Sequence, residues 1–512
     1  MNSPGRADPA EFDDIQALVR FGHGHMTESA FLLLRIRESA AARQWLSAAA
    51  ITSAQPVSPL PDNALQVAFT AIGLRCLGLD DGIVSQFSEE FTSGMSADEN
   101  RSRRLGDTGT NHPRHWLWGG TGDDSPHLVL LAYSVAGKLE SFLEQICTEP
   151  FTTAFDVQQT LNATAAGPEE PFGFADGISQ PLIDWEQSYS AGHHLRDSYS
   201  NRLALGEIVL GYPNEYALYT ARPLLQSSHV AGARILPNAA DQPATRDLGR
   251  NGTYLVLRQL AQDVGGFWQY LDRQTGSDPL QREQLAAAMV GRQRDGSPLI
   301  GGCGRPISGI DPTSTNNQFT FEEDPHGQVC PLGSHIRRAN PRTGDFPPGA
   351  DDACSRLLRT LGFGRRYPGD DLVAASRFHR ILRRGRAYGP SLSPDQALLE
   401  PSQDVPGAER GLYFVCLSGN ISRQFEFVQN AWLMNTKFAG LPTESDPLLG
   451  NRQALASGAT TDHFSLPRQE APARCIRGLP QFVTVRGGAY FFMPGLRALA
   501  FILAQAGDGH QP

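Results

Sequence analysis

The sequence lacks the features that mark membrane proteins, nucleic-acid-binding proteins and exported proteins. No apolar run reaches the ~18 residues that a membrane-spanning helix needs. The 54 acidic residues outnumber the 44 basic ones, and the formal net charge of -10 opposes binding to nucleic acid or to an anionic membrane surface. Residues 1–15 are polar and acidic, without the basic and apolar regions of a secretion signal and without twin arginines. We therefore expect neither a nucleic-acid nor a membrane partner.

Cysteine is sparse, and its spacing does not fit the common zinc and disulfide patterns. The cysteines are odd in number and form no C-x-x-C pair; the seven stand at positions 76, 147, 303, 330, 354, 416 and 475. Disulfide frameworks use an even number of cysteines, and zinc sites use closely spaced pairs. The pattern predicts free thiols in a reducing compartment, so a cytoplasmic location is expected.

What the sequence does contain is an alternation of apolar strands and helices. Four apolar runs predict buried strands, and three further segments predict helices: 31–36, 127–133, 253–260 and 411–417 for strands, and 38–50, 137–147 and 422–434 for helices. Strands separated by helices, without the glycines of a dinucleotide-binding fold, favour an α+β fold of the ferredoxin-like sandwich type. Residues 482–492 predict a hairpin that turns at Gly487-Gly488.

The second half of the sequence repeats the order of the first. Segment 253–273, a strand followed by a helix, parallels segment 29–45, which suggests a duplication. Residues 190–250 are rich in Asn, Ser, Gly, Pro and Asp and are expected to be mostly loop, so a domain boundary should fall there. The predicted domains are residues 1–220 and 221–512.

Three polar motifs each contain a side chain of a type used in catalysis. Residues 331–342 (PLGSHIRRANPR) hold His335, residues 171–181 (PFGFADGISQP) hold Asp176, and residues 378–389 (FHRILRRGRAYG) hold Arg383. A histidine fixed by a turn can offer one ring nitrogen to a metal while an acceptor holds the other nitrogen. Together the motifs resemble the dye-decolourising peroxidase family of haem peroxidases. The resemblance continues through ISRQFEFVQNAW (421–432) and RGGAYFF (486–492).

This resemblance implies both a fold and an activity. It implies two ferredoxin-like domains, with haem b (iron protoporphyrin IX) held mainly by the C-terminal one. It also implies an enzyme that reduces hydrogen peroxide and oxidises dyes, phenols or other aromatic donors in one-electron steps, with a homo-oligomer as one option for its assembly. The rival function is a haem-binding or haem-transfer protein with incidental peroxidase activity. Asp176 and Arg383 count against this rival, because a carrier needs neither.

On the iron-ligand side, the resemblance assigns His335 as the axial ligand. A carboxylate bonded to the other ring nitrogen would increase electron donation to the iron, and Glu426 is the candidate, unless it pairs with Arg423 instead. Either Arg337 or Arg338 is expected to bind a haem propionate. Arg338 is the working assignment, with Arg337 as the alternative.

On the open side, Asp176 is expected to be the acid–base group, unless it only stabilises the turn that follows it. Its pKa, about 4 in water, should fall beside an arginine. By the family's pattern Arg383 is the cation that stabilises charge as the O–O bond breaks. Arg384, on the opposite face of a strand, should be solvated or ion-paired. Phe414 is an expected apolar neighbour of this face, or ordinary strand core.

Two further aromatic residues are candidates for relaying electrons from bulky substrates, Tyr388 and Trp432. Both also fit the simpler role of packing. His379, four residues before Arg383, could lie near the propionates.

Overall fold

The computed structural model describes most of the chain, from residue 9 to residue 505 with several gaps. The described residues are 9–120, 125–164, 167, 169–188, 201–226, 230, 232–300, 316–317, 319–321, 323–342, 376–399, 409–454, 458 and 460–505.

The N-terminal half forms one four-stranded antiparallel set with helices between its strands. Its main elements are β1 (Glu28–Ile36), α2 (Ser39–Ala48), β2 (Asn63–Phe69), β3 (Leu128–Ser134), α7 (Leu139–Ile146), α8 (Glu149–Ala154) and β4 (Phe155–Thr164). The strand order is β4-β1-β3-β2. Short helices fill the connection from β2 to β3, among them α3 (Ala71–Cys76), α5 (Glu89–Ser93) and α6 (Glu99–Leu105). This βαββαβ arrangement is the ferredoxin-like one.

The C-terminal half repeats the same strand order. Its elements are β9 (Thr253–Gln262), α9 (Val264–Thr275), α10 (Pro279–Val290), β10 (Leu382–Arg383), β11 (Arg386–Tyr388), β12 (Gly411–Ser418), the π-helical segments η7 (Ser422–Glu426) and η8 (Val428–Leu433), β15 (Val483–Met493) and α15 (Leu496–Ala504). The order is β10-β12-β9-β15, with β11 also paired to β12. Taking β10 and β11 as the second strand, both halves read 2-3-1-4. The predicted pair of ferredoxin-like units is confirmed, whereas the boundary near residue 220 remains a prediction.

The two halves join into one sheet and share a core. Phe492 of β15 lies opposite Phe69 of β2, and at the far ends β11 contacts β4. Phe31 of β1 and Tyr413 of β12 pack between the halves, with ring centroids 6.0 Å apart. The opposite face of β1, including Leu32, is also fully buried. The strands are therefore covered on both faces, which explains their continuous apolar runs.

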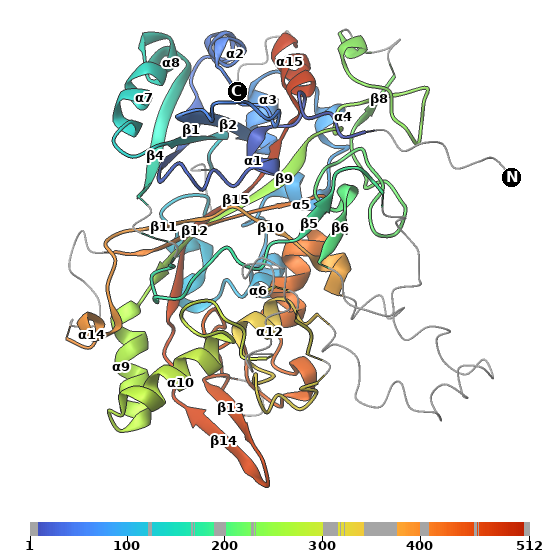
Figure 1. Cartoon of the computed structure of the whole chain (residues 1–512). Coiled ribbons are helices and arrows are strands. Elements are labelled where there is room, and N and C mark those ends of the chain that lie inside the picture. Colours follow the sequence, from blue (N-terminus) through green and yellow to red (C-terminus); the bar gives the residue numbers. More distant parts are fainter. Residues whose placement is uncertain are drawn as a thin grey trace, which may run out of the picture.

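Helices cover the outside of this sheet in two groups. In Figure 1, α2, α7, α8 and α15 lie above the strands, and α9, α10 and α12 (His335–Ala339) lie below them. Within the described ranges, no helix combines the length and the apolar composition needed to cross a membrane.

The predicted hairpin at residues 482–492 is wrong. The chain runs straight through as β15, with a register shift between Val485 and Gly487 where it pairs with β9. A β-carbon on Gly487 would collide with the Trp118 ring, about 2.4 Å away. The glycine therefore permits close packing within the strand and does not make a turn.

Candidate active site

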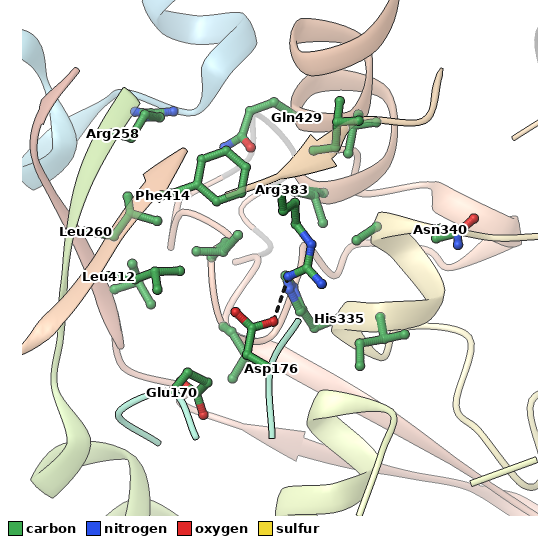
Figure 2. A pocket seen from close by; sticks show the side chains of 18 of the residues that line it. Glu170, Asp176, Arg258, Leu260, His335, Asn340, Arg383, Leu412, Phe414 and Gln429 are labelled. Carbon is green, nitrogen blue, oxygen red and sulfur yellow. Dashed lines mark hydrogen bonds and ion pairs between the residues drawn. The ribbon is translucent and has the colours of Figure 1, made fainter. Parts of the chain in front are cut away.

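A cavity lies mainly in the C-terminal half, and four of the five motifs singled out from the sequence line it, all except 486–492. Residues 105–107 and 111 of the N-terminal half also line it. Its walls come from the 170–179 loop, β9, α12, the 379–383 segment, β12 and the π-helical segments (Figure 2). Apolar side chains make most of the surface, including Phe172, Phe174, Leu260, Leu412, Phe414, Phe425 and Val428. Polar side chains also line it, and His335, Asp176 and Arg383 are among them.

His335 begins the short helix α12 and presents its ring to the cavity. Its Nδ1 lies 2.9 Å from Oδ2 of Asp446. No described residue forms a hydrogen bond with Nε2, and the ring, 26% exposed, lines the cavity. The carboxylate favours a proton on Nδ1, so in the neutral form of the imidazole Nε2 carries the lone pair that a metal ligand needs. Burial opposes protonation of His335, but Asp446 outweighs it and raises the pKa of the imidazole.

Asp446 is itself held in one orientation. Its side chain is fully buried, and Oδ1 accepts hydrogen bonds from the backbone N–H groups of Leu448 at 2.9 Å and Leu449 at 2.8 Å. Although burial raises the pKa of Asp446, His335 and these N–H donors lower it below the usual value. A fixed carboxylate of this kind orients the imidazole and strengthens its donation to a metal.

Asp176 and Arg383 form an ion pair at the cavity wall. Nη1 of Arg383 donates to Oδ1 of Asp176 at 2.8 Å, as Figure 2 shows. The two side chains are 37% and 31% exposed, and both line the cavity. Burial alone would raise the pKa of Asp176, but Arg383 and the N–H of Gly177 lower it below its ordinary value. Asp176 is therefore a carboxylate over a wide pH range.

The loop that carries Asp176 is clamped at both ends. The Glu170 carboxylate accepts the N–H groups of Phe172 and Phe174, each at 3.0 Å, and Nε2 of Gln262 at 2.8 Å. At the other end, Oε1 of Gln180 accepts the N–H of Arg383 at 3.0 Å. The second contact ties the loop directly to strand β10.

Arg383 and Arg384 lie on opposite faces of their strand, as predicted. The Arg384 guanidinium lies away from the cavity and donates to the carbonyls of Leu18 at 2.8 Å and Val19 at 3.1 Å. Arg384 is half-buried, and among the described residues it pairs with backbone carbonyls and forms no ion pair, which corrects that expectation. Burial lowers the pKa of Arg384 to about 10.

Comparison with known proteins points to one family. Dye-decolorizing peroxidase msp1 of Mycetinis scorodonius is 28% identical over 465 residues, covering 88% of this chain and 78% of that protein. A dye-decolorizing peroxidase of Exidia glandulosa is 28% identical over 515 residues, covering 96% and 87%. The crystal structure of a fungal DyP-type peroxidase from Auricularia auricula-judae is similar with a TM-score of 0.71, 25% identity and coverage of 97% and 100%. No family model matches the sequence.

The chain is similar to dye-decolourising peroxidases over most of its length.

Glu426 does not have the place expected of it in a dye-decolourising peroxidase. Its carboxylate accepts from the Tyr490 hydroxyl at 2.9 Å and pairs with Arg101 at 3.1 Å, and His335 bonds Asp446 instead. Glu426 therefore links the π-helical segment to β15 and α6. Its alternative partner, Arg423, bonds Glu207 at 2.7 Å.

Arg338 and Arg337 both form hydrogen bonds inside the protein, and neither is among the residues that line the cavity. Arg338 is fully buried and donates to the carbonyls of Trp432 at 2.8 Å and Glu444 at 2.7 Å. Arg337 donates to Asp324 and to the Cys330 carbonyl. The assignment of Arg338 to cofactor binding is therefore wrong. Four other arginines line the cavity: Arg258, Arg292, Arg380 and Arg383.

The aromatic candidates separate into one cavity residue and two packing residues. Phe414 lines the cavity, 6.2 Å from Phe425 between ring centroids. Tyr388 stacks on Tyr413 at 4.3 Å and donates to Glu409 at 3.0 Å, outside the cavity lining. Trp432 packs against Phe427 at 5.4 Å. The electron relay through Tyr388 or Trp432 remains a prediction. His379 does line the cavity, stacked on Phe427 at 3.6 Å.

Two site residues had escaped the sequence analysis, Asp446 and Glu170. Asp446 stands in a segment without a recognisable motif, 111 residues from His335. Glu170 directly precedes the 171–181 motif, and burial raises its pKa to about 7. Only the position of Glu170 next to this motif offered a signal.

Proposed function

We propose that this protein is a haem b peroxidase that reduces hydrogen peroxide and oxidises dyes and other aromatic donors in one-electron steps. One observation carries the proposal: a histidine whose free Nε2 faces a cavity that also holds a carboxylate paired to an arginine. The relatives named as dye-decolorizing peroxidases, aligned over most of the chain, support the same activity. The free thiols at all five described cysteines support the proposed cytoplasmic location.

The residues present fit a haem group. His335 offers a neutral nitrogen with its tautomer set by Asp446. The apolar walls suit a porphyrin ring, and the lining arginines suit its carboxylates. Haem, when bound, supplies the iron that exchanges electrons with peroxide and with the donors.

Asp176 is proposed to move the proton of hydrogen peroxide. Because Arg383 lowers its pKa, the Asp176 carboxylate is ready to accept the proton from one peroxide oxygen. It then returns the proton to the other oxygen, which leaves as water. The Asp176 side chain is 37% exposed and lines the cavity, which gives the substrate access to the carboxylate.

Arg383 is proposed to stabilise the negative charge that develops on the departing oxygen. Its guanidinium is permanently charged, and its position is fixed by strand β10 and by Gln180. A haem carrier would need neither this cation nor the paired carboxylate. The Asp176–Arg383 pair therefore favours catalysis over haem transfer.

The test is dye oxidation by haem-loaded protein with and without the Asp176 carboxylate. We expect Asp176→Asn to lower kcat/KM for hydrogen peroxide by about 10²- to 10⁴-fold, the usual contribution of a general acid–base group. Glu169→Gln, at an exposed carboxylate in the same loop, should leave the rate unchanged. Equal rates for Asp176→Asn and wild type would contradict the proposed role.

A further inference from the structure

Two arginines, the fully buried Arg338 and the half-buried Arg452, hold the segment that carries Asp446. Arg452 donates to three backbone carbonyls of this segment, those of Asp446 at 3.1 Å, Pro447 at 2.7 Å and Gly450 at 2.7 Å. It also reaches the Pro480 carbonyl at 3.2 Å, next to the start of β15. The Arg452 guanidinium therefore holds residues 446–450 together through hydrogen bonds to three of their backbone carbonyls.

Arg338 ties the same segment to the helix of His335. Its Nε donates to the carbonyl of Gly333 at 3.2 Å, two residues before His335. Its Nη2 donates to the carbonyl of Glu444 at 2.7 Å, two residues before Asp446. The planar Arg338 guanidinium therefore connects the backbone just before His335 to the backbone just before Asp446.

Both arginines also place positive charge beside a fully buried carboxylate. In the part of the chain that the structure describes, neither Arg338 nor Arg452 forms an ion pair within 4.0 Å, so their side chains bind backbone carbonyls and a hydroxyl. A buried carboxylate is costly unless charge and hydrogen bonds compensate it. Asp446 receives two backbone N–H groups, His335 and the field of these two cations.

We propose that Arg452, together with Arg338, is a positioning residue that fixes Asp446 as the acceptor for His335 Nδ1 and so sets how strongly His335 donates electrons to haem iron. This inference rests on the proposed function. The physical reason is that hydrogen bonding to the outer nitrogen of a ligating imidazole controls its basicity, and this hydrogen bond depends on where the carboxylate is held.

Arg452→Lys separates position from charge. Lysine keeps the positive charge but cannot reproduce the planar fork that reaches several carbonyls. Loosening Asp446 should weaken the hydrogen bond to His335, so the ferric/ferrous midpoint potential should become more positive and the iron–histidine stretching frequency should fall. Asp446→Asn defines the full effect, and Arg452→Lys should give a smaller shift of the same sign.

The matched control is Arg386→Lys. The Arg386 guanidinium also clamps backbone carbonyls, those of Gly22 at 3.0 Å and His23 at 2.9 Å, but it lies outside the cavity lining. Arg386→Lys should leave the ferric/ferrous midpoint potential and the iron–histidine stretching frequency unchanged. A wild-type potential in Arg452→Lys, or a shift opposite to that of Asp446→Asn, would overturn the inference.

A second readout needs no haem. The Nδ1 proton of His335 should give a downfield NMR resonance in haem-free protein, and Arg452→Lys should move it upfield or broaden it by exchange. An unaltered resonance would also overturn the inference. Failure of wild type to bind haem would contradict the proposed function alone, because this resonance would still decide the role of Arg452.

Discussion

At the scale of single residues, the cavity combines two acid–base pairs with different tasks. Nδ1 of His335 lies within hydrogen-bond distance of Asp446, which suits the proposed iron ligand, and Arg383 lowers the pKa of Asp176, which suits the proposed acid–base group. Each pair consists of groups from distant parts of the sequence, and burial opposes the charged form of each titrating member. In both pairs the charge of the partner, Asp446 or Arg383, outweighs the effect of burial on the pKa.

The fall in kcat/KM for hydrogen peroxide at low pH (the acid limb of the pH profile) should report the pKa of Asp176, which burial raises and Arg383 lowers. In wild type the limb should lie below the ordinary aspartate value of 3.8, since Arg383 lowers the pKa. Arg383→Met removes the opposite charge, so burial then raises the pKa of Asp176 and the limb moves to higher pH. The measurement is the pH profile of kcat/KM for hydrogen peroxide, which reports groups of the free enzyme.

Arg384→Met is the control, because Arg384 faces away from the cavity and bonds only backbone carbonyls. It should keep the wild-type limb. An acid limb that stays in place in Arg383→Met would show that Arg383 does not set the ionisation of Asp176.

The sequence identified residues of the cavity wall well and their distant hydrogen-bond partners poorly. His335, Asp176, Arg383 and Phe414 stand in recognisable motifs, and all four line the cavity. The prediction that Glu426 is the partner of His335 was wrong, because sequence alone does not distinguish a carboxylate that bonds the ligand histidine from one that links structural elements. Arg338 failed because a basic residue next to a ligand can equally bind backbone carbonyls, and burial decides between the two.

At the scale of elements, the 170–180 loop depends on backbone geometry as well as on its side chains. Gly177, directly after Asp176, has φ +79°, a conformation that costs other residues about 1–2 kcal/mol. A β-carbon there would meet no atom within 4 Å. Any effect of Gly177→Ala would therefore come from the backbone alone.

Gly177→Ala should lower both the free energy of unfolding and the rate with peroxide, because relaxation of the strained turn displaces Asp176. Gly137→Ala is the matched control: Gly137 has φ +75°, also meets no atom within 4 Å, and lies between β3 and α7. It should cost similar stability with unchanged kcat/KM. Denaturant unfolding and peroxide kinetics of the two variants make the comparison. Equal kcat/KM values for both would contradict a role of the turn in placing Asp176.

Some secondary-structure elements could be predicted from the sequence and others could not. Strands β1, β3, β9 and β12 were predictable because both of their faces are apolar. The π-helical form of Ser422–Leu433 and the straight passage of β15 through Gly487-Gly488 were not, because both depend on packing against distant segments.

At the scale of the whole molecule, two units of the same strand order serve different purposes. The N-terminal unit supplies one side of the shared core, where Phe31 meets Tyr413. The C-terminal unit supplies β9, β10, β12 and α12 around the cavity, residues 105–107 and 111 of the N-terminal unit add to its wall, and the connection through residues 170–180 brings Asp176 to it. That the cofactor is held mainly by the C-terminal unit remains a prediction of the family resemblance.

The most direct test of the central claim is haem binding by wild type and His335→Ala, followed by the haem absorption spectrum. We predict one haem per chain in wild type, and a lost or altered Soret band in His335→Ala that added imidazole restores. His379→Ala is the control, since its ring lines the same cavity without a predicted bond to iron, and it should keep the wild-type spectrum. A wild-type affinity and spectrum in His335→Ala would contradict the account at its foundation.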